Sequence, residues 1–253
     1  MGAGHGSHLH VEGDSPVHRL PAHVKLVGLV AFVLLVVALP RGAHGPRVLT
    51  LLVAVGVVLA TRVPWQHVAS RLVVETPFVV FALVLPFVAT GPQRRLGPVT
   101  VSRDGLDAGL ALLVTATTSV LMAIAFATTT SSRDLVRALQ HLRVPDRLVQ
   151  ILSFMVRYLG VVGSQAQRMK VARDSRAFRP RSLGSWPVIA SSAGALFIRS
   201  YERGERVHLA MLSRGYTGQL PVTDPLRATP REWVRGLLPA ALAVVALVVG
   251  YAA

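Results

Sequence analysis

The sequence predicts an all-α, polytopic membrane protein with about five transmembrane helices and a cytoplasmic helical region. The first observation is composition: 52% of the 253 residues are hydrophobic and the mean hydropathy is +0.52, which is more apolar than one soluble core of this size requires. The second is a set of uninterrupted apolar segments. The third is the concentration of arginines in one later stretch of the chain. Together these observations make a lipid bilayer the natural solvent of the chain.

Five apolar segments account for the predicted transmembrane helices. Residues 72–90 and 106–130 are the strongest, because about 20 apolar residues cross the hydrocarbon core. Residues 26–39 and 48–60 are shorter, and the first of them follows charged residues, as the hydrophobic part of a signal peptide does. We interpret both as permanent helices because further apolar segments follow them. Residues 237–252 form the last segment.

Positive charge dominates the chain, with 27 Lys and Arg residues against 12 Asp and Glu residues. Residues 131–216 contain 15 of the basic residues and 5 of the acidic ones. The positive-inside rule therefore places this stretch in the cytoplasm, and the N-terminal tail lies on the same side after four spans. The predicted segments are an N-terminal His-containing tail (1–23), transmembrane helices 1 to 4 (24–130), a cytoplasmic helical region (131–233) and a C-terminal transmembrane helix (234–253).

Residues that would support catalysis are missing from the sequence. The chain has no cysteine, which excludes disulfides, thiolate metal sites and thiol nucleophiles. It also has no glycine-rich phosphate loop, no Gly-x-Ser-x-Gly elbow and no His-Glu-x-x-His zinc helix. We therefore expect no enzyme and no directly bound cofactor, with any ATP hydrolysed by partner subunits. Because the basic stretch lacks a recognised nucleic-acid-binding fold, we expect contact with membrane lipid and not with nucleic acid.

The N-terminal tail holds the only metal candidates that the sequence offers. Imidazole suits nickel, cobalt and zinc, and the tail contains His5, His8 and His10. Their spacing matches no fixed metal site. We interpret the tail as solvated and assign no metal ligands to the chain, with weak, transient metal capture by these histidines as the alternative.

Two features inside the predicted spans attract attention. Glu75 lies near the start of the third span, where a carboxylate is costly. We expect it to pair with Arg71, one turn earlier, rather than to carry protons. Gly105 and Gly109 open the fourth span with the small-xxx-small spacing that allows two helices to approach closely.

Two short arginine motifs are the most informative feature of the sequence. Each places arginine between two small residues and before an aromatic one, and each follows an amphipathic helix, predicted over residues 146–170 and 199–214. The repetition suggests two equivalent docking points that each present one guanidinium to a carboxylate of a partner. On spacing alone, two arginines that satisfy the last carbonyls of their own helices remain an alternative. The motifs are Ser175-Arg176-Ala177-Phe178 and Ser213-Arg214-Gly215-Tyr216.

Over nearly its whole length the sequence resembles the transmembrane T component of energy-coupling factor (ECF) transporters, most closely the cobalt-type CbiQ family. The resemblance rests on short motifs that occur in the family's order. They are 14-DSPVHRL-20, Thr76-Pro77-Phe78, Leu85-Pro86-Phe87, 135-LVRAL-139, Val144-Pro145, 154-FMVRY-158, 199-RSYER-203 and 210-AMLSRGYTG-218.

The resemblance implies a non-catalytic subunit of an ATP-driven cobalt transporter in a bacterial-type cell membrane. Its implied partners are two ABC-type ATPase subunits and a CbiM-like substrate-binding membrane subunit, with or without a small CbiN-like subunit. It also makes residues 131–233 a coupling-helix region. The implied ATPase-coupling residues are Ser175, Arg176, Ala177, Ser213, Arg214 and Gly215.

The chain departs from the family's Ala-Arg-Gly pattern in both motifs. Ser175 and Ser213 replace alanine, and Ala177 replaces glycine. These residues stay small, but Ala177 removes a permissive backbone position, so the first helix end is expected to differ.

A self-sufficient secondary transporter is the main alternative function. Such a protein needs internal repeats, broken helices and polar residues at the membrane midplane. Uptake without any ATPase would favour this alternative.

Overall fold

A computed structural model describes residues 13–40, 42–89, 92–96, 99–176, 178, 183–218 and 228–252. The chain divides into two compact units. Among the described residues, 13–142 and 228–252 form one unit, which we call the membrane unit. Residues 143–218, with the gaps given above, form the other. We call it the α7–α8 unit after its two long helices, α7 (Asp146–Asp174) and α8 (Trp186–Leu212).

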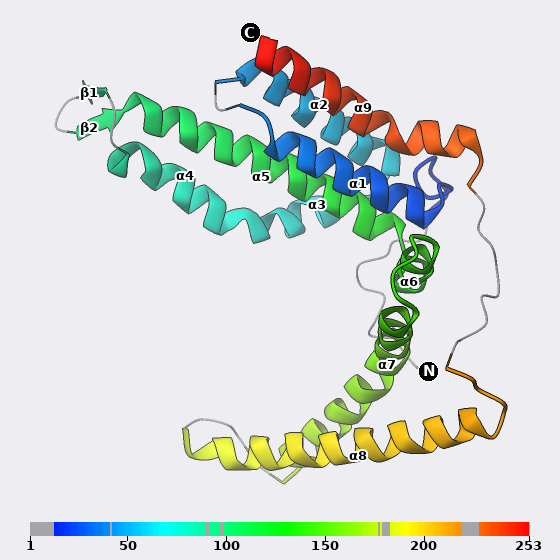
Figure 1. Ribbon diagram of the computed structural model, residues 1–253. Helices are drawn as coiled ribbons and strands as arrows, with labels where there is room; N and C mark the ends of the chain where they lie inside the picture. Colours follow the sequence, from blue (N-terminus) through cyan, green and yellow to red (C-terminus); the bar gives the residue numbers. More distant parts are fainter. Residues whose placement is uncertain are drawn as a thin grey trace. The chain divides into compact units, whose positions relative to one another are not determined.

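The membrane unit is a bundle of helices (Figure 1). A short 3-10 turn, Val73–Glu75, joins α3 (Trp65–Leu72) to α4 (Thr76–Val88). Thr76-Pro77 opens α4 with a proline in the first turn, where its missing N–H is not needed. The helices are α1 (Ala22–Val37), α2 (His44–Thr61), α3 (Trp65–Leu72), α4 (Thr76–Val88), α5 (Arg103–Thr129), α6 (Ser132–His141) and α9 (Pro230–Ala252).

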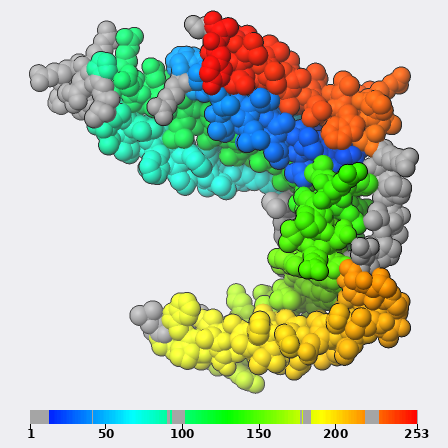
Figure 2. Space-filling model, viewed as in Figure 1, coloured from blue at the N-terminus to red at the C-terminus, as the bar shows by residue number. Residues whose placement is uncertain are grey.

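The first and last helices of the bundle run parallel. A Cβ atom added to Gly28 of α1 would lie 2.4 Å from the carbonyl oxygen of Gly236 of α9. At the opposite end, the Tyr251 hydroxyl donates a hydrogen bond to the Ala38 carbonyl (3.3 Å). Figure 2 shows the red atoms of α9 lying directly against the blue atoms of the N-terminal helices. Residues from the two ends of the chain therefore share one core.

Helix α5 packs beside α1 and runs antiparallel to it. The Lys25 ammonium donates to the Thr129 carbonyl at 2.7 Å, so α5 ends where α1 begins. At the other end, His44 at the start of α2 lies 3.8 Å from Asp107 near the start of α5. We call the region around the start of α1 and the end of α5 the Thr129 end; α2 also finishes there, and α9 starts there.

The core of the bundle is small and apolar. Its buried cluster contains Phe32, Val36, Ala54, Leu121, Met122, Ala240 and Ala243. Many large hydrophobic side chains point outward instead, with exposed fractions of 64% for Leu34, 72% for Leu59 and 72% for Val88. So much exposed apolar surface requires a bilayer or protein partners around it.

Glycines allow the closest helix crossings in the bundle. A Cβ atom on Gly105 would lie 2.6 Å from the Leu85 carbonyl oxygen, and one on Gly109 would lie 2.7 Å from that of Ala82. The predicted close approach through Gly105 and Gly109 is therefore confirmed, with α4 as the partner helix. The equally close crossing of α1 and α9 at Gly28 and Gly236 was not predicted, although Gly236 and Ala240 of α9 have the same small-xxx-small spacing.

Five described helical segments are long and apolar enough to cross a membrane, which agrees with the predicted number. The members differ from those expected. Helix α7, predicted to be cytoplasmic, meets the criteria with the lowest mean hydropathy, 1.2. Helix α1 has 16 residues, or about 24 Å, which is shorter than a hydrocarbon core of about 30 Å. The division of the chain into four predicted segments stays a prediction.

A small β-hairpin between α4 and α5 was not predicted. Strands β1 (Gln93–Leu96) and β2 (Val99–Ser102) pair antiparallel, with Gln93 opposite Ser102. Val99, Thr100 and Val101 are β-branched and favour a strand. The Ser102 hydroxyl then accepts a hydrogen bond from the Gly105 amide and begins α5. The remaining regular structure of the described residues is helical, so the all-α class holds.

The α7–α8 unit contains two long helices joined through a 3-10 turn, Leu183–Ser185. Helix α7 spans Asp146–Asp174, beginning at the predicted residue and extending four residues beyond the predicted end. Helix α8 spans Trp186–Leu212, so the apolar stretch before residue 199 belongs to the predicted charged helix. The Gln150 side chain donates to the Gly218 carbonyl (3.0 Å) and ties the segment after α8 to the first turns of α7.

Candidate functional site

The end of α8 is a complete Schellman motif. Gly215 adopts a left-handed conformation with φ +80°. Its amide donates to the Leu212 carbonyl at 3.0 Å, and the Tyr216 amide donates to the Met211 carbonyl at 3.1 Å. These two bonds satisfy carbonyls that a helix end otherwise leaves open. Arg214 is the last residue before the left-handed position.

The end of α7 is closed by the same long-range bond. The Phe178 amide donates to the Arg173 carbonyl at 3.2 Å, which spans the same five residues as the bond from Tyr216 to Met211. Ala177, predicted to alter this end, lies outside the described residues. Arg176 and Arg214 therefore stand at the same place in two matching closures, each two residues before the aromatic.

The serines that precede the two arginines also make equivalent hydrogen bonds. The Ser175 hydroxyl donates to the Ala172 carbonyl and the Ser213 hydroxyl to the Ala210 carbonyl, both at 3.0 Å. Each hydroxyl is thus satisfied within its own helix. The two serines add no free polar group to the surface around the arginines.

The two arginine side chains are exposed and make no hydrogen bond or ion pair with another described residue. They do not satisfy the last carbonyls of their own helices, because backbone amides and the serine hydroxyls serve that purpose. The guanidinium groups of Arg176 and Arg214 are therefore available to bind a carboxylate or a phosphate.

Arg176 also belongs to a basic groove between α7 and α8, which we call the arginine groove. Its volume is about 550 Å³, and no carboxylate lines it. Glu202 adjoins Arg203 in the sequence, but its carboxylate lies 3.8 Å from the guanidinium of Arg206. Five like charges around one concave surface create a strong positive potential. The five arginines are Arg168, Arg173, Arg176, Arg199 and Arg203.

The surroundings of Arg214 are different. The Tyr216 ring meets the His208 ring edge to face, with centroids 6.5 Å apart and planes at 84°. Tyr216 is half-buried by this contact, whereas Arg214 remains exposed. The two helix ends therefore share their backbone closure but not their electrostatic environment.

The metal candidates of the tail, His5, His8 and His10, lie outside the described residues. Within the described part of the chain, no group of three or more His, Cys, Asp or Glu side chains is arranged to hold a metal ion. Asp14 and Arg19, which lie in the described part of the predicted tail, form an exposed bidentate ion pair with both contacts at 2.7 Å. Hydrogen bonding from Arg19 lowers the pKa of the Asp14 carboxyl below its usual value.

Glu75 is buried in the bundle and accepts a hydrogen bond from the Thr117 hydroxyl of α5. A satisfied carboxylate at this depth fits a structural role better than a proton path. Its predicted pairing with Arg71 stays a prediction.

The arginine groove is the main feature that sequence reasoning missed. Arg199 and Arg203 are four residues apart and so lie on one face of a helix, a signal that was present in the sequence. The approach of α7 to that face is a tertiary contact that no local pattern indicates.

Comparison with known proteins shows which family this chain resembles and which of its residues match. Residues 13–223 match the family model described as "Cobalt transport protein" (CbiQ). An uncharacterised protein of Methanocaldococcus jannaschii is 29% identical over 51% of this chain, and the match spans 48% of that relative. The energy-coupling factor transporter transmembrane protein EcfT of Bacillus selenitireducens is 25% identical over 83% of this chain and 82% of its own length. The cobalt transport protein CbiQ of Rhodobacter capsulatus is 26% identical, covering 84% of each chain.

The matched residues include helices α1 to α6 of the membrane unit and both arginine-bearing helix ends. The apolar helices place the protein in a membrane that it crosses several times. The chain belongs to the CbiQ family and is a transmembrane T component of an energy-coupling factor transporter.

Proposed function

We propose that this chain couples ATP hydrolysis by two ABC-type ATPase subunits to cobalt uptake through a separate substrate-binding membrane subunit. The observation that carries the proposal is the matched pair of helix ends, which present Arg176 and Arg214 exposed and unengaged by other described residues. Two equivalent ends fit a partner with twofold symmetry. The name of the relative from Rhodobacter capsulatus supports cobalt as the transported ion.

The mechanism that follows is rigid-body gating. Each guanidinium docks on a carboxylate of one ATPase subunit, so closure of the ATPase dimer on ATP changes the distance between the two docking points. Helices α7 and α8 contain 29 and 27 residues and measure about 40 Å each. Continuous helices of this length transmit a displacement of their ends to the substrate-binding subunit as a tilt.

The arginine groove strengthens docking at Arg176. Its unneutralised charges attract an acidic partner surface over distance and so raise the association rate. Because bulk salt screens such attraction within about 8 Å at physiological ionic strength, the proposal predicts a salt-sensitive association.

Transport chemistry belongs to the partners in this proposal. ATP is bound and hydrolysed by the ATPase subunits, and cobalt is selected by a CbiM-like subunit, with or without a CbiN-like one. This chain supplies no catalytic residue and no metal ligand. It transmits motion from the ATPase subunits to the substrate-binding subunit.

Copurification tests the docking directly. The tagged chain is coexpressed with a cobalt-type ATPase, and the membranes are extracted with a mild detergent. Three forms of the chain are compared: the wild type, Arg176→Glu plus Arg214→Glu, and Arg147→Glu plus Arg206→Glu. The control pair places one exposed reversal on α7 and one on α8, away from the helix ends that carry Arg176 and Arg214. We expect the wild type and the control to retain the ATPase and the first double variant to lose it. Cobalt uptake by the chain without any ATPase would instead establish the secondary transporter.

Replacing Ser175 and Ser213 together with alanine is expected to leave ATPase retention unchanged. Each hydroxyl is satisfied by its own helix, so its removal exposes no unpaired group and costs no more than about 0.5 kcal/mol. Copurification and thermal unfolding of the double variant measure both quantities. A loss of ATPase binding with unchanged unfolding would show that the hydroxyls contact the partner.

A further inference from the structure

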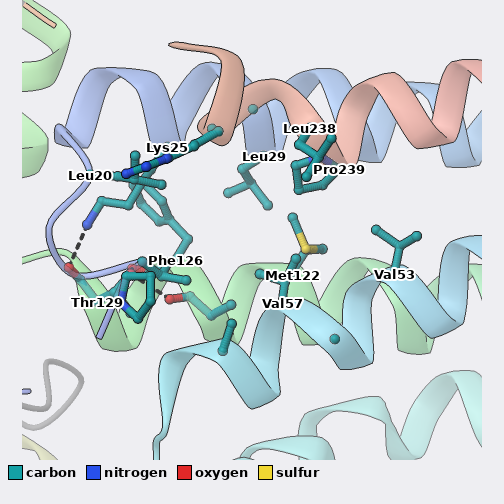
Figure 3. Close-up of a pocket in the computed structure, with 18 of the residues that line it drawn as sticks. Leu20, Lys25, Leu29, Val53, Val57, Met122, Phe126, Thr129, Leu238 and Pro239 are labelled. Carbon is teal, nitrogen blue, oxygen red and sulfur yellow. Dashed lines mark hydrogen bonds between the residues drawn. The ribbon is translucent and has the colours of Figure 1, made fainter. Parts of the chain in front are cut away.

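An apolar pocket of about 480 Å³ opens among α1, α2, α5 and α9 at the Thr129 end of the membrane unit. In Figure 3, Lys25 and Thr129 lie at one end of this pocket, joined by their hydrogen bond. Val53, Met122 and Leu238 lie toward the other end. The pocket is therefore amphiphilic along its length, with its polar atoms gathered where the helices end.

A second pocket of about 480 Å³ adjoins the first, since Pro16, Leu20 and Arg235 line both. Its other lining residues carry charge: they are Asp14, Arg19, Arg62 and Glu232. An apolar cavity thus continues into a charged one at the surface of the bundle.

The charges of the second pocket are unevenly satisfied. Arg19 is held by Asp14, and Glu232 accepts hydrogen bonds from the amide and hydroxyl of Thr229. Arg62 and Arg235 are exposed and make no hydrogen bond or ion pair with another described residue. These two guanidinium groups remain available to an anion.

We propose that the two pockets form one binding site for an anionic phospholipid, with the phosphate at Arg62 and Arg235 and one acyl chain in the apolar pocket. The size of the apolar pocket lies within the range of about 300–1,000 Å³ that is usual for ligand sites. Membrane lipid is the amphiphile that surrounds this bundle. The Thr129 end is also the predicted cytoplasmic end, where anionic lipids are concentrated.

Net charge selects an anionic headgroup over a zwitterionic one. Across the two pockets four cationic side chains, Arg19, Lys25, Arg62 and Arg235, stand against the two carboxylates of Asp14 and Glu232. A lipid with one net negative charge reduces this excess. A zwitterionic lipid leaves it unchanged.

The bound lipid would stabilise the packing of the helices in the membrane unit. The apolar pocket touches all four helices that build the core cluster, together with the segment of Pro16 and Val17 that precedes α1. An acyl chain in the pocket buries apolar surface of each of these elements at once. The lipid is therefore expected to raise the thermal stability of the membrane unit.

The experiment measures lipid retention by the purified full chain in detergent after incubation with phosphatidylglycerol or phosphatidylcholine. Native mass spectrometry counts the bound lipids, and thermal unfolding reports their effect. Arg62→Ala plus Arg235→Ala removes the phosphate ligands, and Val57→Trp fills the apolar pocket. The matched controls are Arg133→Ala plus Arg231→Ala, which are exposed and line neither pocket, and Leu59→Trp, which is 72% exposed on the same helix as Val57.

We expect the wild type to retain one phosphatidylglycerol, and both pocket variants to retain it about tenfold more weakly than their controls. The thermal shift caused by phosphatidylglycerol should disappear in the same two variants. Equal retention of both lipids, or equal retention by Val57→Trp and Leu59→Trp, would overturn the proposal in favour of ordinary shell lipid. Retention of a free fatty acid or detergent in place of phospholipid would also overturn it.

Discussion

Replacing Arg176 and Arg214 together with glutamate is expected to abolish ATP-dependent cobalt uptake by the assembled transporter. Removing one partner of a desolvated charge pair costs about 2 to 5 kcal/mol, or at least about thirtyfold in affinity, and charge reversal adds repulsion. Because the two helix ends have the same closure, we expect each single variant to weaken uptake and the double variant to eliminate it. Uptake of radioactive cobalt into vesicles that contain all subunits measures the effect.

The matched control for this prediction is Arg147→Glu plus Arg206→Glu. It changes the net charge by the same amount on the same two helices. Its only described ion pair, between Arg206 and Glu202 at 3.8 Å, is solvent-exposed and contributes little. Uptake that falls equally in both double variants would mean that total charge, and not docking at the helix ends, controls coupling.

Replacing Gly28 with leucine is expected to disrupt the membrane bundle. The new Cβ atom would lie 2.4 Å from the Gly236 carbonyl oxygen, a backbone atom that cannot rotate away. Helices α1 and α9 would have to separate, which also opens the core around Phe32 and Ala243. Overpacking of this kind costs about 1–3 kcal/mol and more when backbone must move. Thermal unfolding in detergent and the yield of folded protein measure the loss.

Gly45→Leu provides the comparison for this second prediction. Gly45 lies on α2 in the same unit, and an added Cβ atom there meets no atom within 4 Å. The variant therefore makes the same chemical change without a helix crossing. If both variants unfold at the same temperature, the contact between Gly28 and Gly236 does not limit the stability of the bundle.

The sequence was a good guide to the features that depend on local patterns. Hydropathy located the apolar helices, and the spacing of Gly105 and Gly109 indicated their close crossing with a neighbour, because both signals are written in consecutive residues. The match between the ends at Arg176 and Arg214 was also visible as a repeated motif. Whether these arginines dock on the ATPase stays a prediction.

Features that depend on contacts between distant segments could not be predicted. The arginine groove exists because α7 passes the face of α8 that carries Arg199 and Arg203. The amphiphilic pocket requires α9 to return beside α1, more than 200 residues apart in the chain. The hairpin was missed because only β2 alternates apolar and polar residues, over four positions, whereas β1 (Gln93–Leu96) shows no such alternation.

The backbone bonds that close the two helix ends have a mechanical consequence for the proposed coupling. A flexible helix end transmits less displacement than a rigid one, because a frayed end would absorb part of the ATPase motion as local bending. The bonds from Phe178 to Arg173 and from Tyr216 to Met211 fix the backbone at each end before any partner arrives. If the two ends dock on the ATPase subunits as proposed, docking has to order only one arginine side chain at each end, which keeps the entropic cost of binding low. A short motif can therefore carry force without a large interface.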